Sequence, residues 1–152
     1  MLARFLAAAA AAGATLLLVT PPGLAAQAPL PAPVERGLAA LAKGDAAGAV
    51  NEWTATWKAA EDSAKRQNLA ASLQNFADAA GTLRGHDVAR VVDVTPNLKR
   101  VYILLRFDDQ PLYLLLVTYR PERDWQVTAV NWHTDAVRVF PLALLEGGAP
   151  VR

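Results

Sequence analysis

Three short turns constrain the fold of this chain most strongly, because they separate four apolar runs in its second half. The runs cover residues 88–94, 101–107, 112–119 and 125–133, and proline lies in each intervening segment. Connections this short cannot lead to a parallel neighbour, which needs a crossover of about a dozen residues or more. The sequence therefore predicts a four-stranded antiparallel meander.

Apolar residues at helical spacing precede the strands. The first helix is expected over residues 34–43, with Gly44 as its stop. Asp45 is a suitable N-cap for a second helix, on which Trp53 and Trp57 would share one face. This face is expected to line the core or a pocket.

A third helix is expected to start at Asp62 or Ser63 and to end near Gly81. Its apolar stripe consists of Leu69, Leu73, Phe76 and Ala80. The predicted class is therefore α+β, with two or three N-terminal helices packed on one face of a curved four-stranded antiparallel sheet.

Both faces of the predicted sheet are apolar. If Phe107 pairs with Leu112, and Arg120 with Trp125, one face carries Val101, Ile103, Leu105, Phe107, Leu112, Leu114, Leu116, Trp125, Val127 and Ala129. The opposite face carries Tyr102, Leu104, Arg106, Tyr113, Leu115, Val117, Tyr119, Val130 and Trp132. Strands that are apolar on both sides are buried on both sides. A second cover is therefore needed: the C-terminal segment, a dimer partner or a ligand.

The N-terminus has the order of a secretory signal peptide. Arg4 precedes an uncharged apolar run, and small residues follow, with cleavage expected near Ala26. An uncleaved anchor is the alternative, but the run is shorter than the roughly 20 residues that span a bilayer. The expected organisation is a signal peptide over 1–26, a proline-rich extended lead-in over 27–33, one domain over 34–145 and a flexible tail over 146–152. The mature protein would be periplasmic or secreted, and would meet the membrane only through the signal peptide.

Composition restricts the possible partners and cofactors. The chain has 15 basic and 14 acidic residues, and Arg4 alone among them precedes residue 30, so the mature protein is nearly neutral. Such a balance gives no electrostatic footprint for nucleic acid. The absence of cysteine excludes disulfides and thiolate metal sites, and two histidines cannot form a three-histidine site. We expect neither a metal nor a cofactor, and assign Asp108 and Asp109 to a solvated turn.

A set of turn and packing residues carries a resemblance to known proteins. These residues are Tyr102, Phe107, Pro111, Leu112, Tyr119, Pro121 and Trp125. Their pattern resembles small exported bacterial proteins of unknown function, and the order of helices and strands resembles the cystatin-like cone of the nuclear transport factor 2-like superfamily. That superfamily includes isomerases, dehydratases, binding modules and catalytically silent dimers. In the related pattern an acidic pair follows the last strand, where this chain has His133, Thr134 and Asp135.

Two groups of residues are candidates for a site. His133 and Asp135 end the last strand and would suit acid–base chemistry, or would form a polar cluster that ties down the C-terminus. The second group would form an aromatic patch with a nearby cation: Tyr102, Tyr113, Tyr119, Trp132 and Arg106. This patch would be a partner surface or a pocket wall, or cross-strand pairs beneath a covering C-terminal segment.

These observations favour a non-enzymatic exported module that binds an envelope protein, a second copy of itself as a homodimer, or a small apolar ligand. The alternative is a small isomerase- or hydrolase-like pocket enzyme that uses His133, Asp135 or a tyrosine as its acid–base group.

Overall fold

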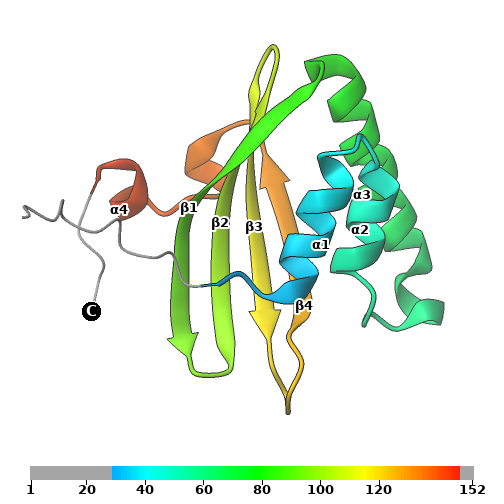
Figure 1. Cartoon of the computed structure of the whole chain (residues 1–152), viewed down its shortest axis with the longest axis vertical. Helices are drawn as coiled ribbons and strands as arrows, with labels where there is room; N and C mark the ends of the chain where they lie inside the picture. The colour runs from blue at the N-terminus through cyan, green and yellow to red at the C-terminus, as the bar shows by residue number, and fades with distance from the viewer. Residues whose placement is uncertain (1–28, 148–152) are drawn as a thin grey trace, which may run out of the picture.

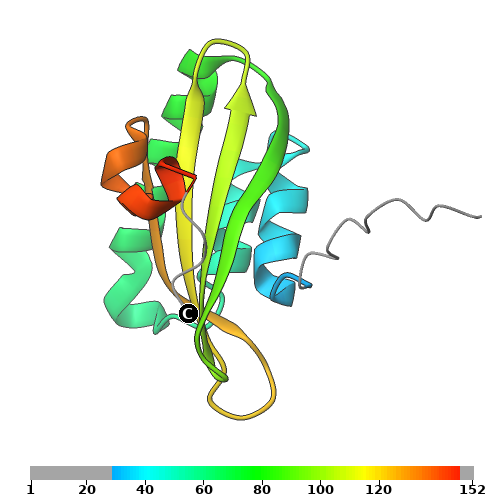
Figure 2. The same cartoon turned by 90° about the vertical axis from the view of Figure 1, so that its left-hand side faces the viewer.

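The computed structural model describes residues 29–147, without the side chains of residues 59–61. The expected signal peptide and residues 148–152 lie outside the described residues. Three layers are present (Figures 1 and 2). Three helices cover one face of a four-stranded sheet, and the C-terminal segment, residues 134–147, lies on the other face. We call this second face the outer face.

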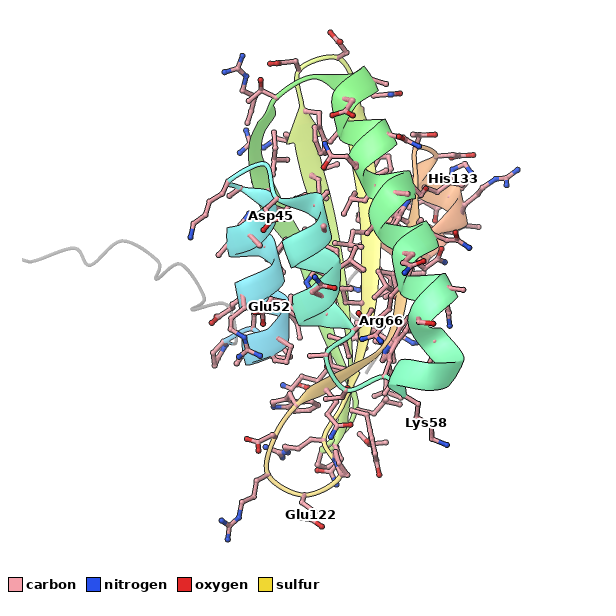
Figure 3. The ribbon with its side chains drawn as sticks, turned by 90° about the vertical axis from the view of Figure 1, so that its right-hand side faces the viewer. Asp45, Glu52, Lys58, Arg66, Glu122 and His133 are labelled. Atoms are coloured by element: carbon pink, nitrogen blue, oxygen red, sulfur yellow. The ribbon has the colours of Figure 1, made fainter. Side chains whose placement is uncertain are left out.

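The helices are α1 (Ala32–Leu41), α2 (Ala46–Trp53) and α3 (Ala59–Ala80). Pro33 lies in the first turn of α1 and not in an extended lead-in, because proline fits where a helix needs no N–H donor. Gly44 ends the α1 turn at a φ of +80°. The Asp45 carboxylate accepts a hydrogen bond from the Gly48 N–H at 2.6 Å, which confirms it as the cap of α2 (Figure 3).

The third helix begins earlier than the sequence suggested. Asp62 and Ser63 lie inside α3, because the Asp62 N–H already donates to the Lys58 carbonyl at 3.0 Å. The predicted stripe is confirmed by Leu73 and Ala80, which are buried. Gly81 ends the helix with a φ of +84°.

The strands are β1 (Leu83–Thr95), β2 (Leu98–Phe107), β3 (Pro111–Tyr119) and β4 (Gln126–His133). They pair antiparallel in the order β1-β2-β3-β4, which confirms the meander. Both β1 and β4 are therefore edge strands. β1 is longer than expected, because it pairs with β2 from Leu83 onward.

The register differs from the predicted one at two places. Leu105, not Phe107, lies opposite Leu112, and this shift by an even number of residues leaves every side chain on its predicted face. Between β3 and β4, an irregularity follows the pairing of Val127 with Thr118, so that Ala129 lies opposite Val117.

This bulge changes the faces of β4, because one extra residue inverts the alternation beyond it. Val130 and Trp132 therefore lie on the helix side, where they pack against the main core, and Ala129 lies on the outer face. The predicted placement of these three residues was wrong for this reason.

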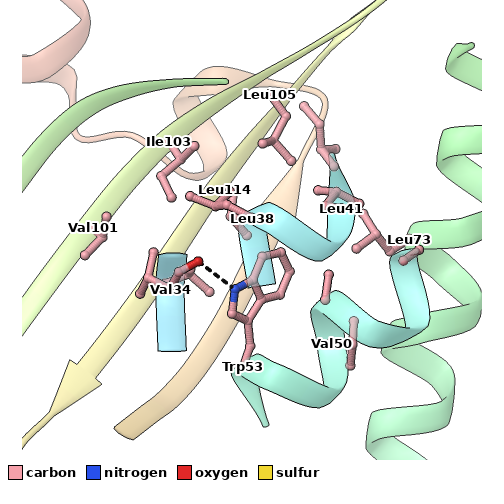
Figure 4. Close-up of a cluster of buried hydrophobic side chains, with 14 of the residues drawn as sticks. Val34, Leu38, Leu41, Val50, Trp53, Leu73, Val101, Ile103, Leu105 and Leu114 are labelled. Carbon is pink, nitrogen blue, oxygen red and sulfur yellow. Dashed lines mark hydrogen bonds between the residues drawn. The ribbon is translucent and has the colours of Figure 1, made fainter. Parts of the chain in front are cut away.

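The main core lies between the helices and the sheet (Figure 4). Trp53 is 1 % exposed, and its indole N–H donates to the Val34 carbonyl at 3.5 Å. Its ring lies against Gly37 of α1, where a Cβ would stand 2.0 Å from the indole nitrogen. The aliphatic residues around it include Leu38, Leu41, Val50, Leu73, Val101, Ile103, Leu105 and Leu114. A large ring therefore occupies the centre of this layer.

Candidate functional site

The outer face contains most of the aromatic residues that the sequence indicated. The pairings place Tyr102 opposite Leu115, and Tyr113 between Leu104 and His133, so all of these side chains share one face. Tyr119 lies at the end of β3 and is 44 % exposed. Trp132 is not part of this face, because of the bulge in β4.

The C-terminal segment covers the centre of the outer face (Figure 2). It contains a short helical turn, η1 (Ala136–Arg138), and the helix α4 (Leu142–Leu145). The Phe140 ring stands edge-on to Tyr102 and to Tyr113, with ring centroids 5.6 and 5.2 Å apart. Val139 and Phe140 are buried with Tyr102 in a second, smaller core. The C-terminal segment, one of the three covers expected for this face, therefore lies on it.

His133 and Asp135 make hydrogen bonds in the turn that leads from β4 into this segment. His133 lies at the end of β4, far from the β3–β4 loop that carries Glu122 (Figure 3). Its Nδ1 accepts a hydrogen bond from the Asp135 backbone N–H at 2.8 Å. The Asp135 carboxylate accepts from the Val137 N–H at 3.2 Å and so caps η1. The contact between the two residues is therefore a backbone-to-imidazole bond, as in a strand-end polar cluster.

Arg106 forms an ion pair with the edge strand β1. Its guanidinium pairs with the Asp87 carboxylate at 2.9 Å, and its backbone lies opposite Gly85 of β1. This ion pair therefore links β2 to β1 near the C-terminal end of β2.

The two tryptophans of the second helix do not share a face. α2 ends at Trp53, and Trp57 lies in the turn that follows. The Trp57 indole N–H donates to the Val127 carbonyl of β4 at 2.8 Å, and the Lys65 ammonium stands 4.4 Å from the ring centroid. The predicted common face was wrong because the helix stops before Trp57. Neither residue lines the groove described next.

A groove lies beside the C-terminal segment, between the outer face and edge strand β1. Its volume is about 390 Å³. We call it the outer groove, and its lining residues are Arg90, Val91, Val92, Asp93, Val94, Arg100, Tyr102, Pro141 and Ala143. Val94 is 47 % exposed, and Pro141 and Ala143 on the opposite wall are exposed as well. Apolar surface is therefore accessible on both walls.

The charges of the outer groove do not cancel. Its one carboxylate, Asp93, is paired with the Lys99 ammonium at 2.7 Å. Arg100 is exposed and makes no ion pair within residues 29–147. The guanidinium of Arg100 therefore gives the groove a positive charge that no carboxylate of the described residues neutralises.

Another groove, of about 400 Å³, lies between the α1–α2 turn and the end of α3. The charged residues on its lining are Lys43 and Asp78, and the Asp78 carboxylate accepts a hydrogen bond from Gln74 at 2.8 Å. Of its large apolar residues, Leu41 and Phe107 belong to the main core and Leu83 packs against it. This groove offers less accessible apolar surface than the outer groove.

The carboxyl of Asp108 has a lowered pKa. The Arg84 guanidinium, hydrogen-bonded to Asp108 at 2.5 Å, lowers the pKa of that carboxyl, and the Thr82 backbone N–H adds to the effect. These contacts join the start of β1 to the β2–β3 turn, so Asp108 has a structural role. No cluster of three or more potential metal ligands is found in the described part of the chain.

The sequence did not single out most of the outer groove. Val92 and Val94 fell within the first strand of the expected meander, which is an edge strand, but no sequence feature placed residues 141–143 beside it. The signal for the other wall was the apolar composition of residues 139–145, directly before the expected tail.

Comparison with models of protein families, with curated proteins and with solved structures finds no significant match to this chain. Among the described helices, none has both the length and the apolar character of a bilayer-spanning segment.

Proposed function

We propose that this chain is an exported, non-enzymatic module that binds a protein partner through the outer face of its sheet. The observation that carries the proposal is the outer groove, a depression of about 390 Å³ that is lined by exposed Val94 on one wall and by exposed Pro141 and Ala143 on the other. Exposed apolar residues that gather at a concave site are typical of interaction surfaces. Export is proposed from the N-terminal sequence pattern.

The filled interior favours a surface role over the storage of a small apolar ligand. Trp53 occupies the centre of the layer between helices and sheet and is 1 % exposed. A ligand within this layer would have to displace the ring from Gly37 and Val34. The outer groove requires no such displacement.

The hydrogen bonds of His133 and Asp135 weigh against the enzymatic alternative. A general base needs a free nitrogen within reach of a substrate proton. Because the His133 Nδ1 accepts from the Asp135 N–H, the neutral imidazole carries its proton on Nε2, and its basic nitrogen is already occupied. One oxygen of the Asp135 carboxylate accepts from the Val137 N–H. Both groups thus support the turn that places Phe140 on the sheet.

For the fold family, we propose the nuclear transport factor 2-like cones. The support is the element order, in which three helices precede a four-stranded antiparallel meander and cover one of its faces. Within such folds, function depends on the site rather than on the fold, and the proposed function therefore rests on the outer groove.

Native mass spectrometry of the protein purified from the periplasm of its own cells tests the proposal. Three forms are compared: wild type, Val94→Asp, and Ala71→Asp on the exposed side of α3 as the control. We expect a complex with a protein partner for the wild type and the control, and its loss for Val94→Asp. A doubled mass would instead make the partner a second copy. A small bound compound, or a complex that Val94→Asp leaves intact, would contradict the proposal.

A further inference from the structure

We infer, resting on the proposed function, that the outer groove binds an extended, acidic segment of the partner protein, which lies alongside β1. Three observations support this: the position of β1 in the sheet, the charge of the groove and the spacing of its apolar residues.

β1 is the strand that the groove follows. Its strand pairing within residues 29–147 is with β2 alone, so its other side forms the edge of the sheet. Five consecutive residues of β1, 90–94, line the groove. A depression lined by consecutive residues follows the strand along its length, and exposed sheet edges bind extended peptides in many proteins.

The charge of the groove selects an acidic segment. Asp93 is neutralised by Lys99, whereas Arg100 is exposed and without an ion pair in the described part of the chain. Arg100 lies directly opposite Val92 in the β1–β2 pairing, so its side chain is on the outer face beside the apolar wall. A guanidinium in this position is suited to a carboxylate, which it binds with two parallel hydrogen bonds.

The apolar lining favours apolar side chains between the carboxylates of the bound segment. Val92 and Val94 on one wall face Pro141 and Ala143 on the other. In an extended chain, side chains two residues apart point the same way and stand roughly 7 Å apart. A segment in which an acidic residue and a β-branched residue stand two positions apart, as in Glu-Ser-Val-Ser, would therefore present carboxylate and apolar side chains on the same face, toward the groove.

The probe is a fluorescein-labelled peptide that repeats Glu-Ser-Val-Ser, called the Glu–Val peptide, and the same peptide with Lys in place of each Glu, called the Lys–Val peptide, serves as the comparison. Fluorescence anisotropy measures the affinity of each for the purified protein. We expect the Glu–Val peptide to bind at least about ten-fold more tightly than the Lys–Val peptide, with weaker binding at higher salt. Equal affinity of the two peptides, or no binding of either, would overturn the inference.

Two variants locate the binding. Arg100→Glu should weaken the Glu–Val complex by about ten-fold or more. Arg123→Glu makes the same charge change at an exposed position of the β3–β4 loop, outside the groove, and should leave the affinity unchanged. If both variants weaken binding equally, the attraction is a general charge effect and the site is wrong.

Backbone recognition is tested with a Glu–Val peptide that carries N-methyl groups at every second residue, which blocks hydrogen bonds along one of its edges. Two such peptides, methylated on alternate edges, are compared. We expect one of them to lose binding, because a chain alongside β1 uses one edge for pairing. Retention of affinity by both would contradict the placement along β1.

The outcome is separable from that of the proposed function. If Val94→Asp abolishes the native complex but the Glu–Val peptide does not bind, the outer face remains the binding surface and the acidic segment is wrong. If neither result is obtained, both proposals fail.

Discussion

The ring of Phe140 stands edge-on to Tyr113 of β3, with 5.2 Å between the ring centroids and an interplanar angle of 80°. This contact fixes the C-terminal segment on a sheet face that would otherwise expose its aromatic residues. The same segment supplies one wall of the outer groove, through Pro141 and Ala143. The C-terminal segment therefore covers the outer face and also forms part of the proposed binding surface.

Phe140→Ala should destabilise the C-terminal segment by about 3 kcal/mol, because a buried aromatic ring is lost together with its contacts to Tyr102 and Tyr113. Urea unfolding measures the change. Leu142→Ala, at a position that is 64 % exposed, is the control and should change the stability by less than about 0.5 kcal/mol. Equal effects of the two changes would show that Phe140 does not hold the segment.

Gly37→Ala should destabilise the packing of α1 on α2 by about 2 kcal/mol or more, because the new Cβ would lie 2.0 Å from the Trp53 indole nitrogen. In a Trp53→Phe background the smaller ring leaves more room, so the same substitution should be less harmful. Additive effects in the double variant would contradict this account of the close approach.

Thr118→Val should raise the free energy of unfolding by about 1 kcal/mol. The Thr118 hydroxyl is buried and has no hydrogen-bond partner among the described residues, and its removal ends that penalty. Thr54→Val is the matched control, since its buried hydroxyl donates to the Val50 carbonyl at 2.7 Å, and it should lower stability. A loss of stability in Thr118→Val would indicate that this hydroxyl is used.

Acid should weaken the junction that Asp108 forms. Its pKa is lowered in the folded chain, first by Arg84 and then by Thr82, so the folded state holds this proton less tightly than the unfolded state. The resulting stabilisation is complete above about pH 5 and is lost as the pH falls through the folded-state pKa. Asp108→Asn should therefore flatten the pH dependence of the urea midpoint below about pH 5.

The control for this measurement is Asp109→Asn, in the same turn, whose carboxylate makes no ion pair within residues 29–147. It should leave the acid limb of the profile unchanged. A profile that is equally steep in wild type and Asp108→Asn would contradict the role given to the Arg84 contact.

Local chemistry accounts for the parts of the fold that the sequence predicted. Asp45 caps a helix and Gly81 ends one, because each acts on its own neighbours. The meander followed from turns too short for any other pairing. These features depend on contacts within a few residues, and they need no knowledge of the rest of the chain.

The predictions from sequence were wrong where contacts between distant parts of the chain determine the structure. A single extra residue in β4 moved Trp132 to the helix side, and no local pattern marks that bulge. Trp57 does not share a face with Trp53, because α2 ends at Trp53 and the Trp57 indole bonds instead to Val127 of β4. The outer groove arises where β1 meets residues 141–143, which are far apart in the sequence, so its lining could not be assembled from either segment alone.

The most direct test of the binding role places a photo-crosslinking residue, p-benzoylphenylalanine, at Val94 in one form of the protein and at Ala71 of α3 in another. Both forms are irradiated in living cells, and the products are identified by mass spectrometry. We expect one defined protein adduct from position 94, lost when Arg100→Glu is added, and none from position 71. Adducts from position 71 alone, or none from position 94, would show that the outer face does not bind the partner.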